Sequence, residues 1–460
     1  MQKLEEGAYM NKTVKRLCCI LMIVIFAVPS VFVVSAANTD TDYVIGNPYE
    51  QVDWDTWGAY KTQLHCHTDV SDGANSIAET VEAYYAAGYD ILAITDHMTL
   101  GVQWDETPEL VSIMRLVKKD RTGFREIVPL TSERREEIMA GTDRNGRGML
   151  EVTTGIELNG AVPRNSHLNG FFSDYGQGLI GIDGDYETPA AEVEKRGGIT
   201  FLDHLGDYTG AYKEGKESES TSDKWVRKFS RIFLDHSACV GTGINSGEDI
   251  QTKNDRILYD EILQKTIPYG VVPWSFCFSD SHANSQVDRA FTVHMMPELA
   301  VDALRTSMEE GTFFSVSRHA RTEIGEDFVG EGPVPTVNRV TVDEKEDRIT
   351  LTAENYDEIV WVANGEIIAK GASIDLDDYS DSITCYVRAY LTGPGGICYV
   401  QPFTVRVPGV ELEKEEIRPV YNYSYIIRKV VTFLDKYVFP EDSLIRRGWN
   451  FLVSDWGFTV

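Results

Sequence analysis

The chain has 460 residues, enough for two or three domains, and its 42% hydrophobic content suits globular folding. Its formal net charge of −29 disfavours bulk nucleic-acid binding, because Lys and Arg make most contacts to phosphate backbones. A small phosphorylated ligand remains compatible with this charge, since metal ions can supply local positive charge.

The first 37 residues have the composition of an export signal. Lys12, Lys15 and Arg16 precede an apolar run over 17–34, and small residues follow at 35–37. Cleavage after this run predicts a protein of the cell envelope or the extracellular space. The alternative is an uncleaved N-terminal anchor, because the run is nearly long enough to span a bilayer.

The cysteines predict no disulfide framework. Two of the seven lie in the expected signal, and the other five are widely spaced and odd in number. A turn at 393–396 is expected to place Cys398 opposite Leu391, so Cys398 would not face Cys385. Cys66 alternates away from its neighbours His65 and His67, and we expect it in the core.

Short apolar runs alternate with helical patterns between residues 60 and 314. The spacing predicts helices over 76–88, 255–265 and 297–310, and strands over 61–67, 91–94, 151–158, 167–172, 199–204, 239–245 and 271–278. Alternation of this kind is typical of a parallel α/β architecture, so we expect a TIM-like β/α barrel over 38–325.

A segment over about 99–148 interrupts the alternation and is locally basic. Nine Lys and Arg residues but six acids lie between Arg115 and Arg147. One interpretation is a solvated helical excursion, as charge runs usually are. The other is a lid whose arginines, Arg134, Arg135 and Arg144 among them, contact an anionic substrate.

The pattern changes after the expected barrel. Residues 333–407 contain short alternating strands separated by turn residues, which predict a small immunoglobulin-like β-sandwich. Residues 408–460 begin as an acidic linker and continue as a tail whose apolar residues over 423–439 have helical spacing. This helix either docks on the main domain or lies on a membrane surface.

A series of metal-ligand residues follows the ends of the expected strands. His65 and His67 stand on one face of a strand, because residues two apart on a strand point the same way. Six of the nine histidines and three carboxylates fall in this series, at the strand ends where barrel active sites lie. The members are His65, His67, Asp72, His97, Glu157, His167, His204, Asp280 and His282.

The order of these motifs over residues 60–320 resembles the PHP (polymerase and histidinol phosphatase) family of metal-dependent phosphoesterases. The resemblance implies a distorted barrel with two or three divalent metal ions at the carboxyl ends of the strands. It implies one metal held by His65, His67, Glu157 and Asp280. It implies that Glu157 bridges to a second metal, completed by His167 and His204, and that Asp72, His97 and His282 hold a third. Asp72 stands where some members have His.

This donor set suits Zn, Mn or Fe, and the sequence does not choose among them. Metal ions of this kind generate a bridging hydroxide and bind phosphoryl oxygens during in-line displacement. Glu157 and Asp280 would bridge the metals or orient the hydroxide. Asn245, which ends an expected strand on the same rim, is a further catalytic candidate. Arg134, Arg135 and Arg289 are candidates for binding the substrate.

The sequence therefore predicts an exported metal-dependent phosphoesterase that hydrolyses a small phosphomonoester or a nucleotide-like phosphodiester. One alternative is an envelope-associated binding module, in which the barrel is mainly a scaffold for the β-sandwich and the tail. Another is a metal-dependent hydrolase of a non-phosphate substrate. Membrane-surface association through the N-terminal segment or the C-terminal helix is compatible with each of these hypotheses.

Overall fold

A computed structural model describes residues 41–110, 125–159, 166–176, 180–181, 186–209, 220–246 and 249–421, with isolated positions and short pieces at 115, 118 and between 426 and 459. The expected export signal lies outside the described residues, as does most of the expected tail helix over 423–439. Within the described part, no helix is both long and apolar enough to cross a membrane.

The first domain contains the strands β2 Gly58–Gln63, β3 Ile91–Leu92, β4 Leu150–Glu151, β5 Ile156–Asn159, β6 His167–Phe171, β7 Ile180–Gly181, β8 Ile199–Leu202, β9 Cys239–Ser246, β10 Trp274–Phe278, β11 Ala290–Met296 and β12 Phe313–Ser317. The helices are α2 Ile77–Ala86, α4 Ser132–Ala140, α5 Glu187–Lys195, α6 Leu205–Tyr208, α7 Asp223–Asp235, α8 Asp249–Thr266, α9 Val301–Glu310 and α10 Arg321–Ile324, with short 3-10 turns η1 Ile267–Tyr269 and η2 Asn284–Gln286.

The helix α2 illustrates how local sequence sets these elements. Ser76 accepts a hydrogen bond from the backbone of Glu79, and the Glu79 side chain returns one to the backbone of Ser76, which satisfies two free donors at the helix start. The helix ends before Gly88, whose φ of +80° suits glycine. The buried face carries Ile77, Val81 and Tyr84, so the predicted helix is confirmed.

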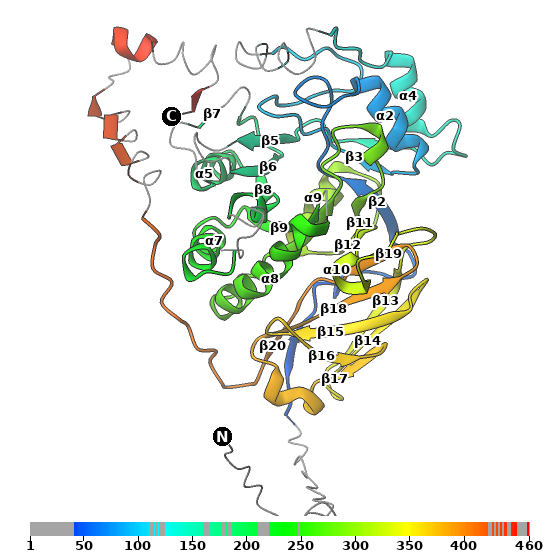
Figure 1. The fold of residues 1–460 in the computed structure, drawn as a ribbon, viewed down its shortest axis with the longest axis vertical. Helices are drawn as coiled ribbons and strands as arrows, with labels where there is room; N and C mark the ends of the chain where they lie inside the picture. The colour runs from blue at the N-terminus through cyan, green and yellow to red at the C-terminus, as the bar shows by residue number, and fades with distance from the viewer. Residues whose placement is uncertain are drawn as a thin grey trace, which may run out of the picture. The chain divides into compact units, whose positions relative to one another are not determined.

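The strands of the first domain form two sheets. One contains the order β12-β11-β2-β3-β4, and the other has the order β10-β9-β8-β6-β5-β7, to which β21 Phe458–Thr459 adds. In Figure 1, helices α5, α7 and α8 lie along one side of this second sheet. Two isolated bridges, Cys66 with Ser281 and His97 with Glu157, join the sheets at the strand ends. The architecture is mixed α/β, and a closed TIM-like barrel is not confirmed.

The expectation of an all-parallel sheet is wrong at β6. This strand pairs antiparallel with both β5 and β8. The connection from β5 to β6 is too short for the crossover that parallel neighbours need, so the chain returns antiparallel. The strand expected over 151–158 also divides into β4 and β5, which lie in different sheets.

An aromatic core lies between the two sheets. Phe201 and Phe276 stack with ring centroids 4.4 Å apart, and Phe313 lies 4.6 Å from Phe276. Phe278 continues this layer toward the strand ends and meets the ring of His65 edge-on at 4.9 Å. Such aromatic pairs add stability beyond the area that they bury. They also form the packed layer that His65 contacts.

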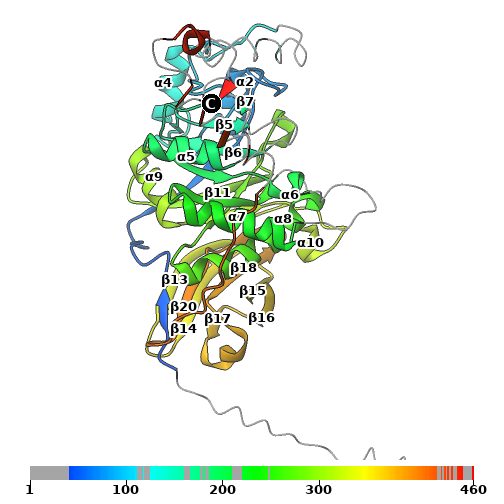
Figure 2. The same ribbon diagram turned by 90° about the vertical axis from the view of Figure 1, so that its left-hand side faces the viewer.

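The second set of strands comprises β1 Val44–Gly46, β13 Thr336–Asp343, β14 Arg348–Glu354, β15 Glu358–Ala363, β16 Glu366–Lys370, β17 Ser373–Asp375, β18 Tyr386–Gly393, β19 Gly396–Tyr399 and β20 Phe403–Arg406, with the 3-10 turn η3 Asp377–Ser382. We call these strands the β-domain. In Figures 1 and 2 it lies at the opposite end of the molecule from α2 and α4. The strand β1 precedes β2 in the chain and pairs with β20.

The β-domain is joined to the first domain by backbone pairing and by a buried ion pair. Strand β19 pairs antiparallel with β12, which makes one sheet continuous through both domains. In addition, Arg388 of β18 donates to both oxygens of Asp260 in α8, at 2.8 and 2.6 Å. A bidentate pair of this kind adds geometric specificity as well as energy, so the two domains are held in one arrangement.

The predicted positions of Cys398 in the hairpin and of Cys66 in the core are confirmed. Leu391 pairs with Cys398 across the β18–β19 hairpin, and the five described cysteines, which are Cys66, Cys239, Cys277, Cys385 and Cys398, are all buried and free. The thiol of Cys66 contacts the carbonyl oxygen of Ala93 at 3.5 Å, inside the core.

The buried histidine of β11 makes stability depend on pH. Burial lowers the pKa of His294 to about 3, whereas an unfolded histidine titrates near 6.5. Below pH 6.5 the unfolded chain therefore binds a proton that the folded chain does not, and stability falls as the pH drops toward 3. We expect wild type to lose about 2 kcal/mol more than His294→Gln between pH 7 and pH 5. Urea unfolding at both pH values measures this difference, and equal losses would contradict it.

Candidate metal centre

The loops after the strands are tied to one another by backbone hydrogen bonds. The amide of His67 donates to the carbonyl of Ser281 at 2.9 Å, and the amide of Thr95 donates to the carbonyl of Cys66 at 3.0 Å. The backbone amide of Met98, in the loop after β3, donates to the carbonyl of Glu157 at 3.1 Å. These bonds bring strand ends from both sheets to one place, and all nine predicted ligand residues converge there.

Glu157 lies at the centre of the cluster. Its Oε1 lies 2.6 Å from Nδ1 of His167 and 3.6 Å from Nε2 of His204. Its Oε2 lies 3.1 Å from Nε2 of His67 and 3.0 Å from Nδ1 of His97. The side chain is 1% exposed, so one buried carboxylate touches imidazoles from four segments of the chain.

Asp280 and Asp72 flank this centre on either side. Oδ1 of Asp280 lies 3.2 Å from Nε2 of both His65 and His67. Oδ1 of Asp72 lies 3.5 Å from Nε2 of His282. Within the described residues, four groups have donor atoms close enough to share an ion: His67, Asp72, His97 and His282; His65, Glu157 and His204; His65, His67 and Asp280; and His97, Glu157 and His167.

The donor spacing fits metal ions of the expected kind. Two ligand atoms about 2.1 Å from a tetrahedral ion are about 3.4 Å apart, and the distances above fall around this value. Several donor atoms are also buried without a hydrogen-bond partner, among them Nε2 of His65 and His67, both oxygens of Glu157 and Oδ1 of Asp280. Buried polar atoms are normally paired, so these atoms are suited to hold a cation.

The charge state of the carboxylates also indicates a cation site. Burial would raise the pKa of Glu157, but His167, His97 and His65 hold it well below its usual range. Burial would also raise the pKa of Asp280, which its neighbouring imidazoles, His65 foremost, hold low. These carboxylates are therefore ionised inside the protein and require nearby positive charge.

The pKa values of the imidazoles differ because their surroundings differ. Burial lowers the pKa of His65 to about 3. Burial acts in the same direction on His97, but Glu157 and Asp72 outweigh it and raise the pKa of His97 to about 10. A bound divalent ion would take over the charge of such a protonated imidazole, so metal binding is expected to release protons.

Two ligand positions have strained backbones. His204 has φ +24° and Asp280 has φ +46°, which are left-handed conformations that residues other than glycine rarely adopt. Each costs about 1–3 kcal/mol, and such strain gathers at functional sites. The neighbouring loop is equally tight, because a Cβ on Gly73 would lie 2.7 Å from the carbonyl oxygen of His67.

The first two histidines are oriented by hydroxyl groups that we had not singled out. Nδ1 of His65 lies 2.8 Å from Oγ1 of Thr95. Nδ1 of His67 lies 3.4 Å from Oγ of Ser71, which in turn donates to the buried carboxylate of Asp96. A hydroxyl that accepts from Nδ1–H leaves the Nε2 lone pair free for a metal. The signal was present in the sequence, since these residues stand inside or beside the ligand motifs.

The side chain of Asn245 is held in hydrogen bonds to other parts of the fold. Its side chain is buried, its Nδ2 donates to the carbonyl of His319 at 2.8 Å, and its Oδ1 accepts from Ser317 at 3.0 Å. A further contact joins Nδ2 to the hydroxyl of Tyr399 in the β-domain. Both ends of the amide are occupied, so its role is corrected to a structural one.

The arginines of the basic segment are also placed differently from our expectation. Arg134 pairs with Glu82, Glu137 and Asp143. Arg135 pairs with Glu151 and lies 3.5 Å from Asp105.

Arg144 donates to the carbonyl of Tyr89, and its guanidinium lies 3.7 Å from Asp90, to which Arg147 is also paired. Arg134, Arg135, Arg144 and Arg147 thus neutralise acids of the protein itself. The expected substrate contact of Arg134 and Arg135 is corrected to a structural role.

The fold and the converging side chains define an α/β protein with a histidine–carboxylate site suited to metal ions. Residues 63–241, less than half of the chain, match the PHP domain family. This region of the chain is therefore similar to PHP domains. The match ends before Asp280 and His282, which the fold brings to the same site.

Two solved structures show similarity at low identity. A two-domain protein from Bacteroides vulgatus, containing a predicted PHP-like metal-dependent phosphoesterase, is 14% identical, with 81% of this chain and 94% of that chain covered at a TM-score of 0.40. A proposed metal-dependent phosphoesterase from Bifidobacterium adolescentis is 14% identical, with 48% and 87% covered at a TM-score of 0.27. At these TM-scores the likenesses add nothing to the assignment. No curated protein matches the sequence.

The hydroxyl of Thr95 is expected to control metal affinity. Valine has the shape of threonine but leaves Nδ1–H of His65 without its acceptor, which favours the wrong tautomer. We expect Thr95→Val to weaken metal binding by about 10- to 100-fold, measured by chelator competition. The control is Thr306→Val, since Thr306 is exposed on α9 and bonds only its own helix. Equal affinities for both variants and wild type would contradict the assignment.

Proposed function

We propose that this protein is a metal-dependent phosphoesterase that hydrolyses a small phosphomonoester or a nucleotide-like phosphodiester. The observation that carries the proposal is the cluster of nine imidazole and carboxylate side chains built around Glu157 in a PHP domain. Hydrolysis breaks the P–O bond to the alcohol, forms a new P–O bond from water and transfers a proton to the leaving alcohol. Bound Zn, Mn or Fe ions supply the charge that offsets phosphoryl oxygens and lowers the pKa of water.

The exposed fractions of the site's side chains support one direction of substrate approach. Glu157 and His65 are almost completely buried, whereas the side chains of His282 and Asp280 are 37% and 22% exposed. Nδ1 of His282 lies 3.0 Å from the carbonyl of Asp280. A carbonyl only accepts, so Nδ1 carries the proton and the Nε2 lone pair is directed to the site. A phosphoryl group therefore reaches the cluster from the side of Asp280 and His282.

The central carboxylate provides the test of the proposal. Glu157→Gln keeps the size of the side chain but removes the charge, so we expect phosphatase activity on p-nitrophenyl phosphate or its diester to fall by about 100-fold or more. The assay uses protein loaded separately with Zn, Mn and Fe.

The matched control is His236→Gln, because His236 lies outside the cluster, beside Glu194. This variant should keep wild-type activity. Wild type without turnover on either ester would contradict the phosphoesterase proposal and favour a binding role.

We also propose that the mature protein is exported, on the support of the basic, apolar and small-residue pattern of residues 12–37. Membrane-surface association through this segment or through the tail remains part of the proposal. Intact mass measured on protein from the envelope or medium should show a chain that begins near residue 38. Recovery of uncleaved chain from the cytoplasmic fraction would contradict export.

A further inference from the structure

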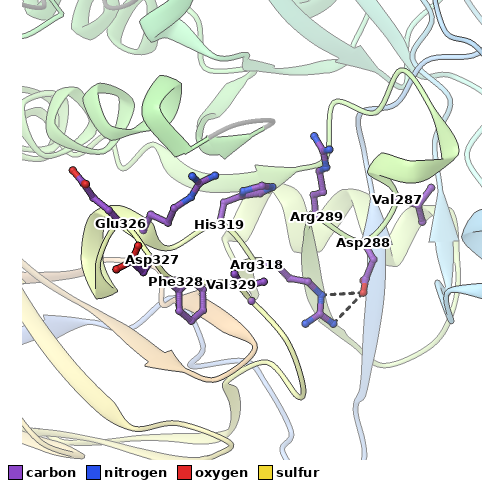
Figure 3. Close-up of a pocket in the computed structure, with 11 residues that line it drawn as sticks. Val287, Asp288, Arg289, Arg318, His319, Glu326, Asp327, Phe328 and Val329 are labelled. Carbon is purple, nitrogen blue, oxygen red and sulfur yellow. Dashed lines mark hydrogen bonds and ion pairs between the residues drawn. The ribbon is translucent and has the colours of Figure 1, made fainter.

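A pocket of about 490 Å³ lies where β11 begins and β12 ends. Its lining includes Arg289, Arg318, His319 and Phe328. Figure 3 shows the guanidinium of Arg289 directed away from Arg318, which is paired with Asp288. The metal centre does not use any of these side chains.

The pocket borders the metal centre through the residue after Arg289. The carbonyl of Ala290 accepts from Oγ of Ser279 at 2.9 Å and from Nε2 of Gln63 at 3.2 Å. Ser279 directly precedes Asp280, and Oε1 of Gln63 accepts from the amide of His65 at 3.2 Å. Consecutive Cα atoms are about 3.8 Å apart, so the backbone of Arg289 lies close to two ligand-bearing segments.

The other charged residues of the pocket do not pair with Arg289, so its guanidinium can bind an anion. Asp288 is already paired with Lys61 and with Arg318, and Arg318 also donates to the carbonyl of Gly332 at 2.9 Å. The side chain of Arg289, in contrast, makes no hydrogen bond or ion pair in the described part of the chain, and it is half-buried. An uncompensated guanidinium beside a phosphoester site is suited to bind an anion, since its fork matches carboxylate and phosphate oxygens.

Acids face this arginine from the other side of the pocket. Glu326 and Asp327 follow α10 and are exposed to solvent. In Figure 3 they lie beyond His319, away from Arg289. Exposed charges are screened by water, so these acids weaken the binding of an anion at Arg289 only slightly.

The β-domain contacts two of the residues that line this pocket. Nη1 of Arg318 donates to the carbonyl of Gly395 in the β18–β19 turn at 3.3 Å. Phe328 packs against a core cluster that includes Tyr386 and Tyr399 of the β-domain. The bond from Asn245 to Tyr399 anchors the same region. The β-domain thus fixes the wall of the pocket and is more than an appended module.

We propose that this pocket binds a second anionic group, a carboxylate or a phosphate, on the alcohol part of the phosphoester, with Arg289 as the contact that selects it. The inference rests on the proposed phosphoesterase function and deepens it. The preferred substrates are therefore small esters with two anionic groups, one at the metal centre and one at Arg289.

The test compares matched alkyl phosphates with two, three or four carbons that end in a hydroxyl, a carboxylate or a second phosphate. We expect wild type to prefer one of the two anionic ends at least tenfold in kcat/KM, and Arg289→Ala to lose this preference mainly through KM. Arg289→Lys should retain part of it. Activity on the hydroxyl-ended esters should be similar in all variants.

Two control variants distinguish a general effect of net charge from a specific effect of Arg289. Arg305→Ala removes one positive charge from the exposed face of α9, where Arg305 pairs with Glu309, and should keep the preference. Glu326→Gln should not reduce it either. A preference absent from wild type, or an equal loss on all esters in Arg289→Ala, would overturn the inference.

A binding measurement separates failure of the pocket from failure of the proposed function. Calorimetry on metal-loaded protein uses 2-carboxyethylphosphonate and propylphosphonate, which cannot be hydrolysed as esters. We expect the carboxylate to strengthen binding at least tenfold in wild type and not in Arg289→Ala. This result without ester hydrolysis would overturn the phosphoesterase function alone. Hydrolysis with no dependence of binding on Arg289 would overturn the pocket alone.

Discussion

The burial of the Glu157 carboxylate among imidazoles is the constraint on which the rest of the structure depends. An ionised carboxylate that is 1% exposed is costly unless charge of opposite sign lies beside it. His67 and His97 supply part of that charge, but several donor atoms in the described part of the cluster make no hydrogen bond. Metal ions would satisfy these atoms together, so we regard the cluster as a centre built for cations and stabilised by them.

The frame around the cluster holds the donors in place before any ion binds. Hydroxyl groups of Thr95 and Ser71 orient two imidazoles, and left-handed backbones at His204 and Asp280 direct two more ligands. Below them lies the aromatic layer that ends at Phe278. The pairing of β12 with β19 and the pair between Asp260 and Arg388 extend this rigidity into the β-domain. Preorganisation of this kind is what precise metal geometry requires.

The sequence was informative wherever the signal was local. The helix after Ser76, the strand ends with their ligands and the pairing of Cys398 with Leu391 followed from periodicity and turn residues. Three features could not be predicted from periodicity: the closure of the site, the antiparallel pairing of β6 and the role of the basic segment. Each depends on which distant residue a side chain or strand contacts. Arg135, for example, pairs with Glu151 across the fold, and periodicity carries no information on such a partner. Asn245 was misread for the same reason, since Tyr399 lies 154 residues away.

The central claim is that the side chains around Glu157 form a metal centre. Anomalous diffraction from crystals of the loaded protein, recorded at the absorption edges of Zn, Mn and Fe, tests it most directly. The account predicts peaks about 2.0–2.2 Å from the oxygens of Glu157 and from Nε2 of His65 and His67. A map without peaks among these residues, in which the imidazoles remain paired with the carboxylates, would contradict it.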